Sequence, residues 1–150
     1  MAKLNQAHID QITQRIERIP ADAAPLWGKM NRDQMFGHLA DVVRYSMGQG
    51  PEVPFKGNFK TKYVFAPLVL FGIKQIPQNI RAPRAKGAPE HGTRTCSAEE
   101  LKSVLGEFLV NSTNGGMSTP HHPFFGHIGV SGWRRFHVVH CDHHLRQFGV

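Results

Sequence analysis

Apolar side chains recur with helical spacing near the start of the chain. The first stripe comprises Leu4, His8, Ile9, Ile12, Ile16 and Ile19. Spacings of three and four residues place these side chains on one face of an α-helix. Pro20 cannot continue the helix, because proline lacks the backbone N–H and its ring clashes with the preceding turn. We therefore expect a first amphipathic helix that ends before Pro20.

A second stripe follows after a loop and comprises Met35, His38, Leu39, Val42 and Tyr45. Asn31 and Gln34 have the spacing of a capping box, in which each side chain bonds to the backbone N–H of the other residue. Gly48 follows the last apolar position, as is typical of a helix end. The pattern predicts a second helix between Asn31 and Gly48.

Two further stripes lie in the last third of the chain. Ser97 and Glu100 have the spacing of another capping box, and they precede Leu101, Val104, Leu105, Phe108 and Leu109. The last stripe begins near Gly129 and comprises Trp133, Phe136, His137, His140, His144, Gln147 and Phe148. No segment shows the alternating pattern of a strand, so helices are the only elements that we expect.

The connection between the second and third of these helices is long, about residues 50–96, and rich in Pro, Gly and charge. Its one helical signal is short and runs from Pro67 to Phe71. Four amphipathic helices bury their apolar faces best when they pack against one another as a bundle. We predict an all-α four-helix bundle over residues 1–150, a single domain, with a long crossover connection between the second and third main helices.

The composition agrees with one globular domain. The chain has 150 residues, of which 40% are hydrophobic and 19% charged, and such values are typical of folded rather than disordered proteins. The N-terminus lacks the apolar core of a signal peptide. The longest apolar run, around Tyr63–Ile73, falls short of the roughly 20 residues that span a membrane. We therefore expect a cytoplasmic protein with no membrane partner.

Most of the net positive charge lies in the connection. Residues 53–94 hold eight Lys and Arg and one acid, Glu90, whereas the rest of the chain is balanced. Aromatic residues among such charges can stack on bases, as in proteins that bind single-stranded nucleic acid. No recognisable nucleic-acid motif accompanies them, so we favour a solvated connection and do not expect a nucleic-acid partner. An anionic small molecule would also suit this charge.

Histidine is unusually frequent, with ten copies. Residues i and i+4 of a helix point the same way about 6 Å apart, so His140 and His144 can bind one metal ion. His137 points in nearly the same direction but lies about 10 Å along the axis from His144. His38 interrupts the apolar face of the second helix, where an imidazole needs a partner. That partner is either a backbone carbonyl or Tyr45, or a metal ion shared with the pair.

Several motifs resemble those of a known family. They are LWGKMNRDQMFGHLADV, HPFFGHIG, the Trp133 that follows, and HCDHHLRQFG, in this order. On these motifs the chain resembles the DinB/YfiT-like superfamily, in particular a small branch with an HHLRQFG-type C-terminus. The resemblance implies a four-helix bundle in which His38, His140 and His144 hold a divalent metal ion, with Gln147 after the pair. Three neutral imidazoles with an open coordination position form a reactive rather than a structural metal site.

The resemblance also implies a type of chemistry. In several characterised relatives the metal activates a low-molecular-weight thiol, such as bacillithiol, mycothiol or glutathione, for transfer or isomerisation. We therefore expect a small-molecule substrate and Zn²⁺ as the metal, with Ni, Fe or Mn as alternatives. The sequence identifies no general base, so the catalytic residues stay unassigned. Two other functions stay open: a non-catalytic metal-binding or stress-associated protein, and a nucleic-acid binder that uses residues 53–94.

Two polar residues are candidates for contact with the metal ligands. Gln147 lies one turn beyond His144, where it could orient that ligand or bind a metal-bound water. His122 would supply a fourth polar group if the loop before the last helix folds back onto the site. Cys141 lies beside the ligand face and has no C-x-x-C partner, so we expect it in the helix packing. A leftover apolar flank of the bundle would allow a homodimer.

Overall fold

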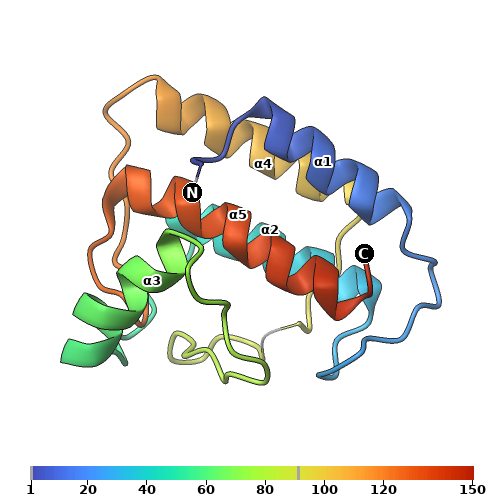
Figure 1. Cartoon of the computed structure of the whole chain (residues 1–150), viewed down its shortest axis with the longest axis horizontal. Helices are drawn as coiled ribbons and strands as arrows, with labels where there is room; N and C mark the ends of the chain where they lie inside the picture. The colour runs from blue at the N-terminus through green and yellow to red at the C-terminus, as the bar shows by residue number, and fades with distance from the viewer. Residues whose placement is uncertain (1, 91) are drawn as a thin grey trace.

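Four long helices carry the fold in the computed structural model, which describes residues 2–90 and 92–150 (Figure 1). They are α1 (Gln6–Glu17), α2 (Arg32–Ser46), α4 (Ala98–Thr113) and α5 (Gly129–Gln147). A π-helical turn, η1 (Thr61–Phe65), and the short helix α3 (Ala66–Leu70) lie in the connection between α2 and α4. The described residues contain no strand, only an isolated bridge between His122 and Gly126. The predicted all-α bundle with its long crossover is confirmed.

The two helix starts for which the sequence predicts a capping residue, those of α2 and α4, have that cap. Asn31 and Gln34 form the full capping box at the start of α2. Ser97 accepts a hydrogen bond from the backbone N–H of Glu100 at the start of α4. The reciprocal half of that box is not formed, because the Glu100 carboxylate pairs with Arg44 and Arg94 instead. The last helix, α5, starts at Gly129 without a side-chain cap.

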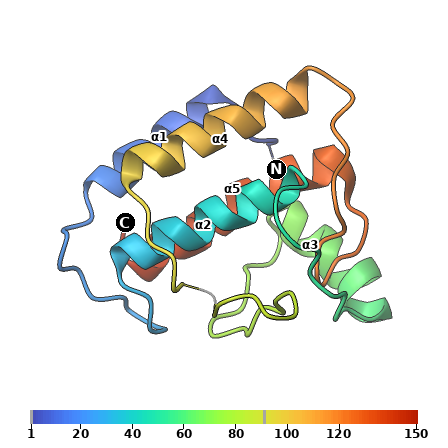
Figure 2. The ribbon, with the colours of Figure 1, turned by 180° about the vertical axis from the view of Figure 1, so that it is seen from behind.

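The four helices form two layers. In Figures 1 and 2, α1 and α4 lie side by side in one layer and α2 and α5 form the other. The short helix α3 packs on α5. The crossover passes along the side of α2 and α5 that faces away from α1 and α4. One layer is therefore sandwiched between the other layer and the crossover.

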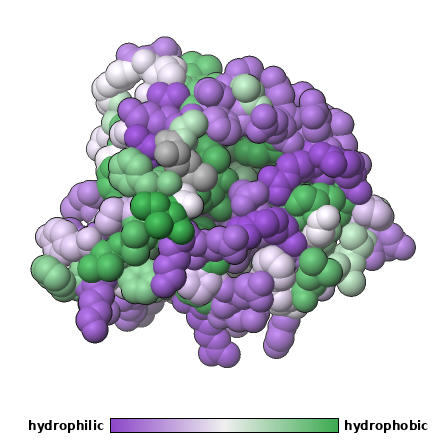
Figure 3. Space-filling view, in the orientation of Figure 1, coloured by the Kyte–Doolittle hydropathy of each residue, from purple (hydrophilic) through white to green (hydrophobic). Residues whose placement is uncertain are grey.

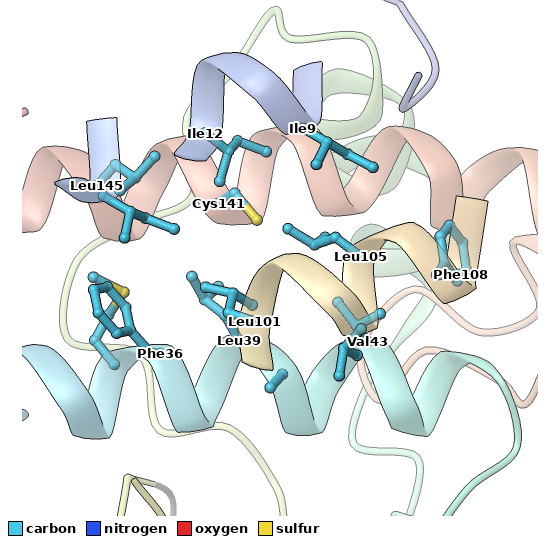
Figure 4. Close-up of a cluster of buried hydrophobic side chains, with 14 of the residues drawn as sticks. Ile9, Ile12, Phe36, Leu39, Val43, Leu101, Leu105, Phe108, Cys141 and Leu145 are labelled. Carbon is cyan, nitrogen blue, oxygen red and sulfur yellow. The ribbon is translucent and has the colours of Figure 1, made fainter. Parts of the chain in front are cut away.

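The hydrophobic core lies between the two layers. Figure 4 shows side chains from all four long helices pointing toward one another, among them Ile12 of α1, Leu39 of α2, Leu105 of α4 and Leu145 of α5. Burial of each such side chain contributes about 1.5–3 kcal/mol to folding. Cys141 is one of these core residues, as expected, and burial raises its pKa to about 12. None of the helices in the described ranges is long and apolar enough to cross a bilayer.

Candidate metal centre

Three histidines from two neighbouring helices converge on one point. His38 comes from α2, and His140 and His144 come from successive turns of α5. The Nε2 atom of His140 lies 3.2 Å from Nε2 of His38 and 3.2 Å from Nε2 of His144. One ligand atom from each of the three lies within 4.8 Å of the others. All three residues are buried, so these nitrogens face one another in a largely dry space.

The spacing of the nitrogens fits a single bound ion. When a metal holds imidazole nitrogens at about 2.0–2.1 Å with tetrahedral geometry, its ligand atoms stand about 3.3 Å apart. The two separations of 3.2 Å that involve His140 agree with that value, and all three ligand atoms lie within 4.8 Å of one another. Without an ion, a single N–H on His140 can satisfy only one of its two neighbours at a time. One cation would satisfy all three lone pairs at once.

Burial keeps two of these imidazoles neutral. Desolvation holds the pKa of His140 well below its usual range, and the neighbouring His144 and His38 lower it further. Desolvation also lowers the pKa of His144, to about 4, against a raising effect of its hydrogen bond to Gln147. Since metal binding requires deprotonated ligands, these two nitrogens are available at neutral pH without competition from protons.

Gln147 fixes which nitrogen of His144 faces the cluster. Its Nε2 donates to the carbonyl of Trp27 over 2.6 Å, and a carbonyl can only accept. The amide oxygen of Gln147 must therefore be the atom 2.8 Å from Nδ1 of His144, so Nδ1 carries the proton and donates. The neutral ring is then unprotonated at Nε2, which faces the other histidines. Gln147 thus contacts His144 directly and orients its ring.

A glycine makes room for this hydrogen-bond chain. Gly28 has φ +78°, and a Cβ at this position would stand 2.6 Å from Nε2 of Gln147. Both the left-handed backbone and the close approach favour glycine here. No sequence pattern predicts the contacts that Gly28 and the Trp27 carbonyl make with Gln147. A glycine in a loop signals a turn, but the contact is with a residue more than a hundred positions away.

His122 lies outside the cluster. Its Nδ1 accepts hydrogen bonds from the backbone N–H groups of Phe124 and Phe125, which fold the loop over its own ring. The ring centroid lies 4.5 Å from that of Phe136, and Phe136 in turn stacks on His140 at 4.9 Å. The Phe136 ring therefore lies between His122 and the candidate ligand His140. The structure does not bring it to the site as a fourth polar group.

His137 belongs to a separate buried group, as its position along the helix predicted. Its Nε2 lies 2.9 Å from Oγ of Ser46, which itself donates to the carbonyl of Val43. Because the Ser46 hydroxyl donates its proton to Val43, His137 must be the donor in this pair. The ring also packs against Phe108 and Trp133. Burial lowers the pKa of His137 to about 3, which keeps it neutral.

His143 is buried next to the site without joining it. Its ring contacts the rings of Trp27 and His144 edge-on, with centroids 5.7 and 5.0 Å away. A hydrogen bond with the backbone of Ile76 ties it to the crossover, although desolvation still lowers its pKa. His143 and His144 are adjacent in sequence, yet only His144 presents a ligand atom to the cluster. The helix directs the His143 ring toward Trp27 and the His144 ring toward His38 and His140.

Fold and site together define a class: an all-helical bundle with three buried histidines close enough to hold one metal ion. Residues 1–149 match the model of the family described as Protein of unknown function (DUF1569), and the chain belongs to that family. The family is grouped in the DinB/YfiT-like superfamily, so the motif resemblance is confirmed at that level. The narrower branch with an HHLRQFG-type C-terminus stays a prediction. No curated protein and no solved structure matches the chain significantly.

Proposed function

We propose that this protein binds a divalent metal ion through His38, His140 and His144 and acts on a small molecule by activating a thiol or a water there. The observation that carries the proposal is that Nε2 of buried His140 lies 3.2 Å from Nε2 of both His38 and His144, with one ligand atom of each residue within 4.8 Å of the others. A set of imidazole ligands suits Zn, Cu, Fe or Ni better than Mg or Ca, which prefer oxygen. We assign Zn²⁺, with Ni, Fe and Mn as the competing ions.

The bound ion would lower the pKa of a thiol or water in its open position, which yields a nucleophile near neutral pH. The surrounding residues hold the ligands in place for this task. Gln147 orients His144, and the Phe136 ring lies flat against His140. Each of the three histidines is buried and keeps 8–9% of its surface exposed. The proposal requires that a small ligand reach the cluster from solvent. The superfamily resemblance favours a low-molecular-weight thiol over water.

Two measurements test the proposal. Protein purified without a His-tag is analysed for its elements and then titrated with Zn²⁺, Ni²⁺, Fe²⁺ and Mn²⁺. The metal-loaded protein is next mixed with glutathione, bacillithiol or mycothiol and an electrophilic acceptor, and the loss of free thiol is followed. We expect one metal per chain and thiol consumption that His144→Ala abolishes.

The other outcomes separate the competing functions. Stoichiometric metal without any thiol or hydrolytic turnover would point to a non-catalytic metal-binding protein. Absence of metal affinity in the wild type would reject the proposal altogether. Tight, sequence-selective binding to DNA or RNA would instead favour the nucleic-acid function, because nonspecific phosphate contacts typically give only about 10⁻⁴ to 10⁻⁶ M.

A further inference from the structure

An apolar stripe on the crossover continues past the end of the bundle. The helical segment 59–70 carries Phe59, Tyr63, Ala66 and Leu70 at spacings of three and four residues. Ala66 and Leu70 are buried where α3 packs on α5. Phe59 and Tyr63 are 74% and 57% exposed, although their rings contact each other with centroids 4.9 Å apart. Half of the stripe is covered by the bundle, and the other half is left to solvent.

Lysines accompany the uncovered half. Its exposed side chains, which we call the tip surface, are Lys56, Phe59, Lys60, Lys62, Tyr63 and Val64. Lys62 Nζ lies 5.0 Å from the centroid of the Tyr63 ring, so charge and apolar surface are interleaved. No Asp or Glu occurs between residues 53 and 89 to neutralise this charge. The tip surface is therefore both apolar and strongly basic.

The tip surface also projects from the molecule. In Figure 1, η1 and the start of α3 extend beyond one end of the bundle, and in Figure 3 the same corner shows apolar and hydrophilic side chains next to one another. A projecting surface can contact a broad, flat partner while the four long helices stay packed. Exposed apolar patches rimmed by polar groups mark interaction sites more often than chance.

We propose that the tip surface docks on an anionic lipid bilayer. Phe59, Tyr63 and Val64 would enter the boundary between headgroups and acyl chains, where aromatic and aliphatic side chains are stabilised. The three lysines would lie at the level of the negative headgroups, which attract basic side chains near the surface. No helix has to cross the membrane in this arrangement. We expected no membrane partner because no apolar run is long enough to span a bilayer. That criterion detects spanning segments but not a surface of six side chains.

Charge and shape favour a bilayer over two other occupants. A second copy of the chain would bring lysine against lysine, because the surrounding segment contains no acid to compensate. Single-stranded nucleic acid would gain from stacking on Phe59 and Tyr63, but Val64 has no ring and its apolar side chain gains nothing there. A lipid surface satisfies the aliphatic side chain, the aromatic rings and the lysines together.

Vesicle co-sedimentation of the full chain tests this proposal. The wild type is mixed with vesicles of phosphatidylcholine alone and of phosphatidylcholine with phosphatidylserine. We expect binding to the mixed vesicles only, weakened by salt. Lys60→Glu with Lys62→Glu should weaken it by at least about fivefold per lysine. The matched control is Lys3→Glu with Lys102→Glu, which changes the net charge equally at exposed positions outside the tip surface.

The apolar half of the surface has its own matched pair. Phe59→Ser with Tyr63→Ser should reduce binding by about tenfold or more, whereas Leu26→Ser with Val110→Ser removes two exposed apolar side chains elsewhere and should leave it unchanged. The proposal would be overturned if the control variants lost as much vesicle binding as the tip-surface variants, or if the wild type did not bind the mixed vesicles. The proposal would also be overturned if the wild type formed a homodimer or bound single-stranded DNA, and if only the Phe59→Ser with Tyr63→Ser variant lost that property.

Discussion

At the scale of single residues, the candidate metal centre depends on a hydrogen-bond chain that begins in a loop. The Trp27 carbonyl holds the amide of Gln147, and that amide holds Nδ1 of His144. The loop between α1 and α2 thereby determines which nitrogen of His144, on α5, is unprotonated and faces the other two histidines. Groups behind metal ligands typically affect affinity by about 10–100-fold, although they never touch the ion.

Replacement of His144 by Ala should remove the metal and leave the bundle folded. One of three ligands is lost, so affinity should fall by more than the roughly 100-fold that loss of a supporting residue causes. His143→Ala should retain the metal, because its ring contacts Trp27 and presents no ligand atom to the cluster. Calorimetric metal titration and circular dichroism measure the two effects. Loss of binding in His143→Ala alone would mean that the ligands are assigned in the wrong register.

Gly28→Ala should weaken metal binding from outside the site. The new Cβ would stand 2.6 Å from Nε2 of Gln147 and push the amide away from His144. Gly48→Ala is the matched control, since Gly48 has φ +79° but a Cβ there would meet no atom within 4 Å. Both variants carry similar backbone strain, so a difference of about 10-fold or more in metal affinity isolates the role of Gln147. Equal affinities would show that the hydrogen-bond chain does not support the ligand.

Sequence alone located the three histidines but not what surrounds them. The i, i+4 spacing placed His140 and His144 on one face, because helix geometry is local. The sequence pattern also put His38 in the middle of an apolar stripe, whereas the core side of α2 is formed by Phe36, Leu39 and Val43 (Figure 4). The histidines lie at the edge of that core side. Packing between segments that are distant in the sequence determines which edge of α2 faces α5. The local spacing of apolar residues does not contain this information.

At the scale of elements, the absence of a side chain at Gly37 allows the crossover to pack closely on α2. Gly37 in α2 lies under the end of the crossover, and a Cβ there would stand 2.7 Å from the carbonyl carbon of Arg94 and 3.2 Å from Cα of Thr95. Arg94 is held in place by ion pairs with Asp41 of α2 and Glu100 of α4. The crossover therefore meets α2 one residue before His38, and its end is fixed to both helices.

Two alanine substitutions in helices should have opposite effects on stability. Gly37→Ala forces the backbone of the crossover away from α2 and should lower the free energy of unfolding by about 1–3 kcal/mol. Gly106→Ala in α4 meets no atom within 4 Å and should raise it by about 0.5–1 kcal/mol, because alanine loses less backbone entropy in a helix. Urea unfolding measures both. Stabilisation by Gly37→Ala would contradict the close packing of the crossover.

The long helices were predictable and the crossover was not. Each of α1, α2, α4 and α5 repeats an apolar spacing over several turns, so many residues give the same signal. The short helical signal at Pro67–Phe71 was correct as far as α3, but η1 before it was missed. Exposed Phe59, just before η1, and exposed Tyr63, within it, continue the apolar stripe without burial. Apolar spacing predicts a helix because one of its faces is buried, and this segment projects from the bundle with much of its apolar surface exposed.

At the scale of the whole molecule, buried histidines make the fold sensitive to acid. Desolvation lowers the pKa of His122 and of His137 to about 3, against about 6.5 in the unfolded chain. Between these values the unfolded state binds more protons than the folded state. Stability contributed by each residue is therefore fully present above about pH 6.5 and is lost as the pH falls below it.

His137→Leu should make the fold less sensitive to acid. Protonation of His137 would place a positive charge between the rings of Phe108 and Trp133, far from water. Removal of this residue eliminates one proton taken up on unfolding. When the pH is lowered from about 7 to about 5, the free energy of unfolding should fall by about 2 kcal/mol less in His137→Leu than in the wild type.

Urea unfolding at the two pH values measures this difference, with a chelator present so that metal release does not contribute. His127→Ala is the control, because it removes an exposed histidine instead of a buried one. An unchanged loss of stability in His137→Leu would mean that His137 becomes protonated inside the folded protein. The buried pair with Ser46 would then have to open in acid, and the core around Trp133 would be less rigid than its packing indicates.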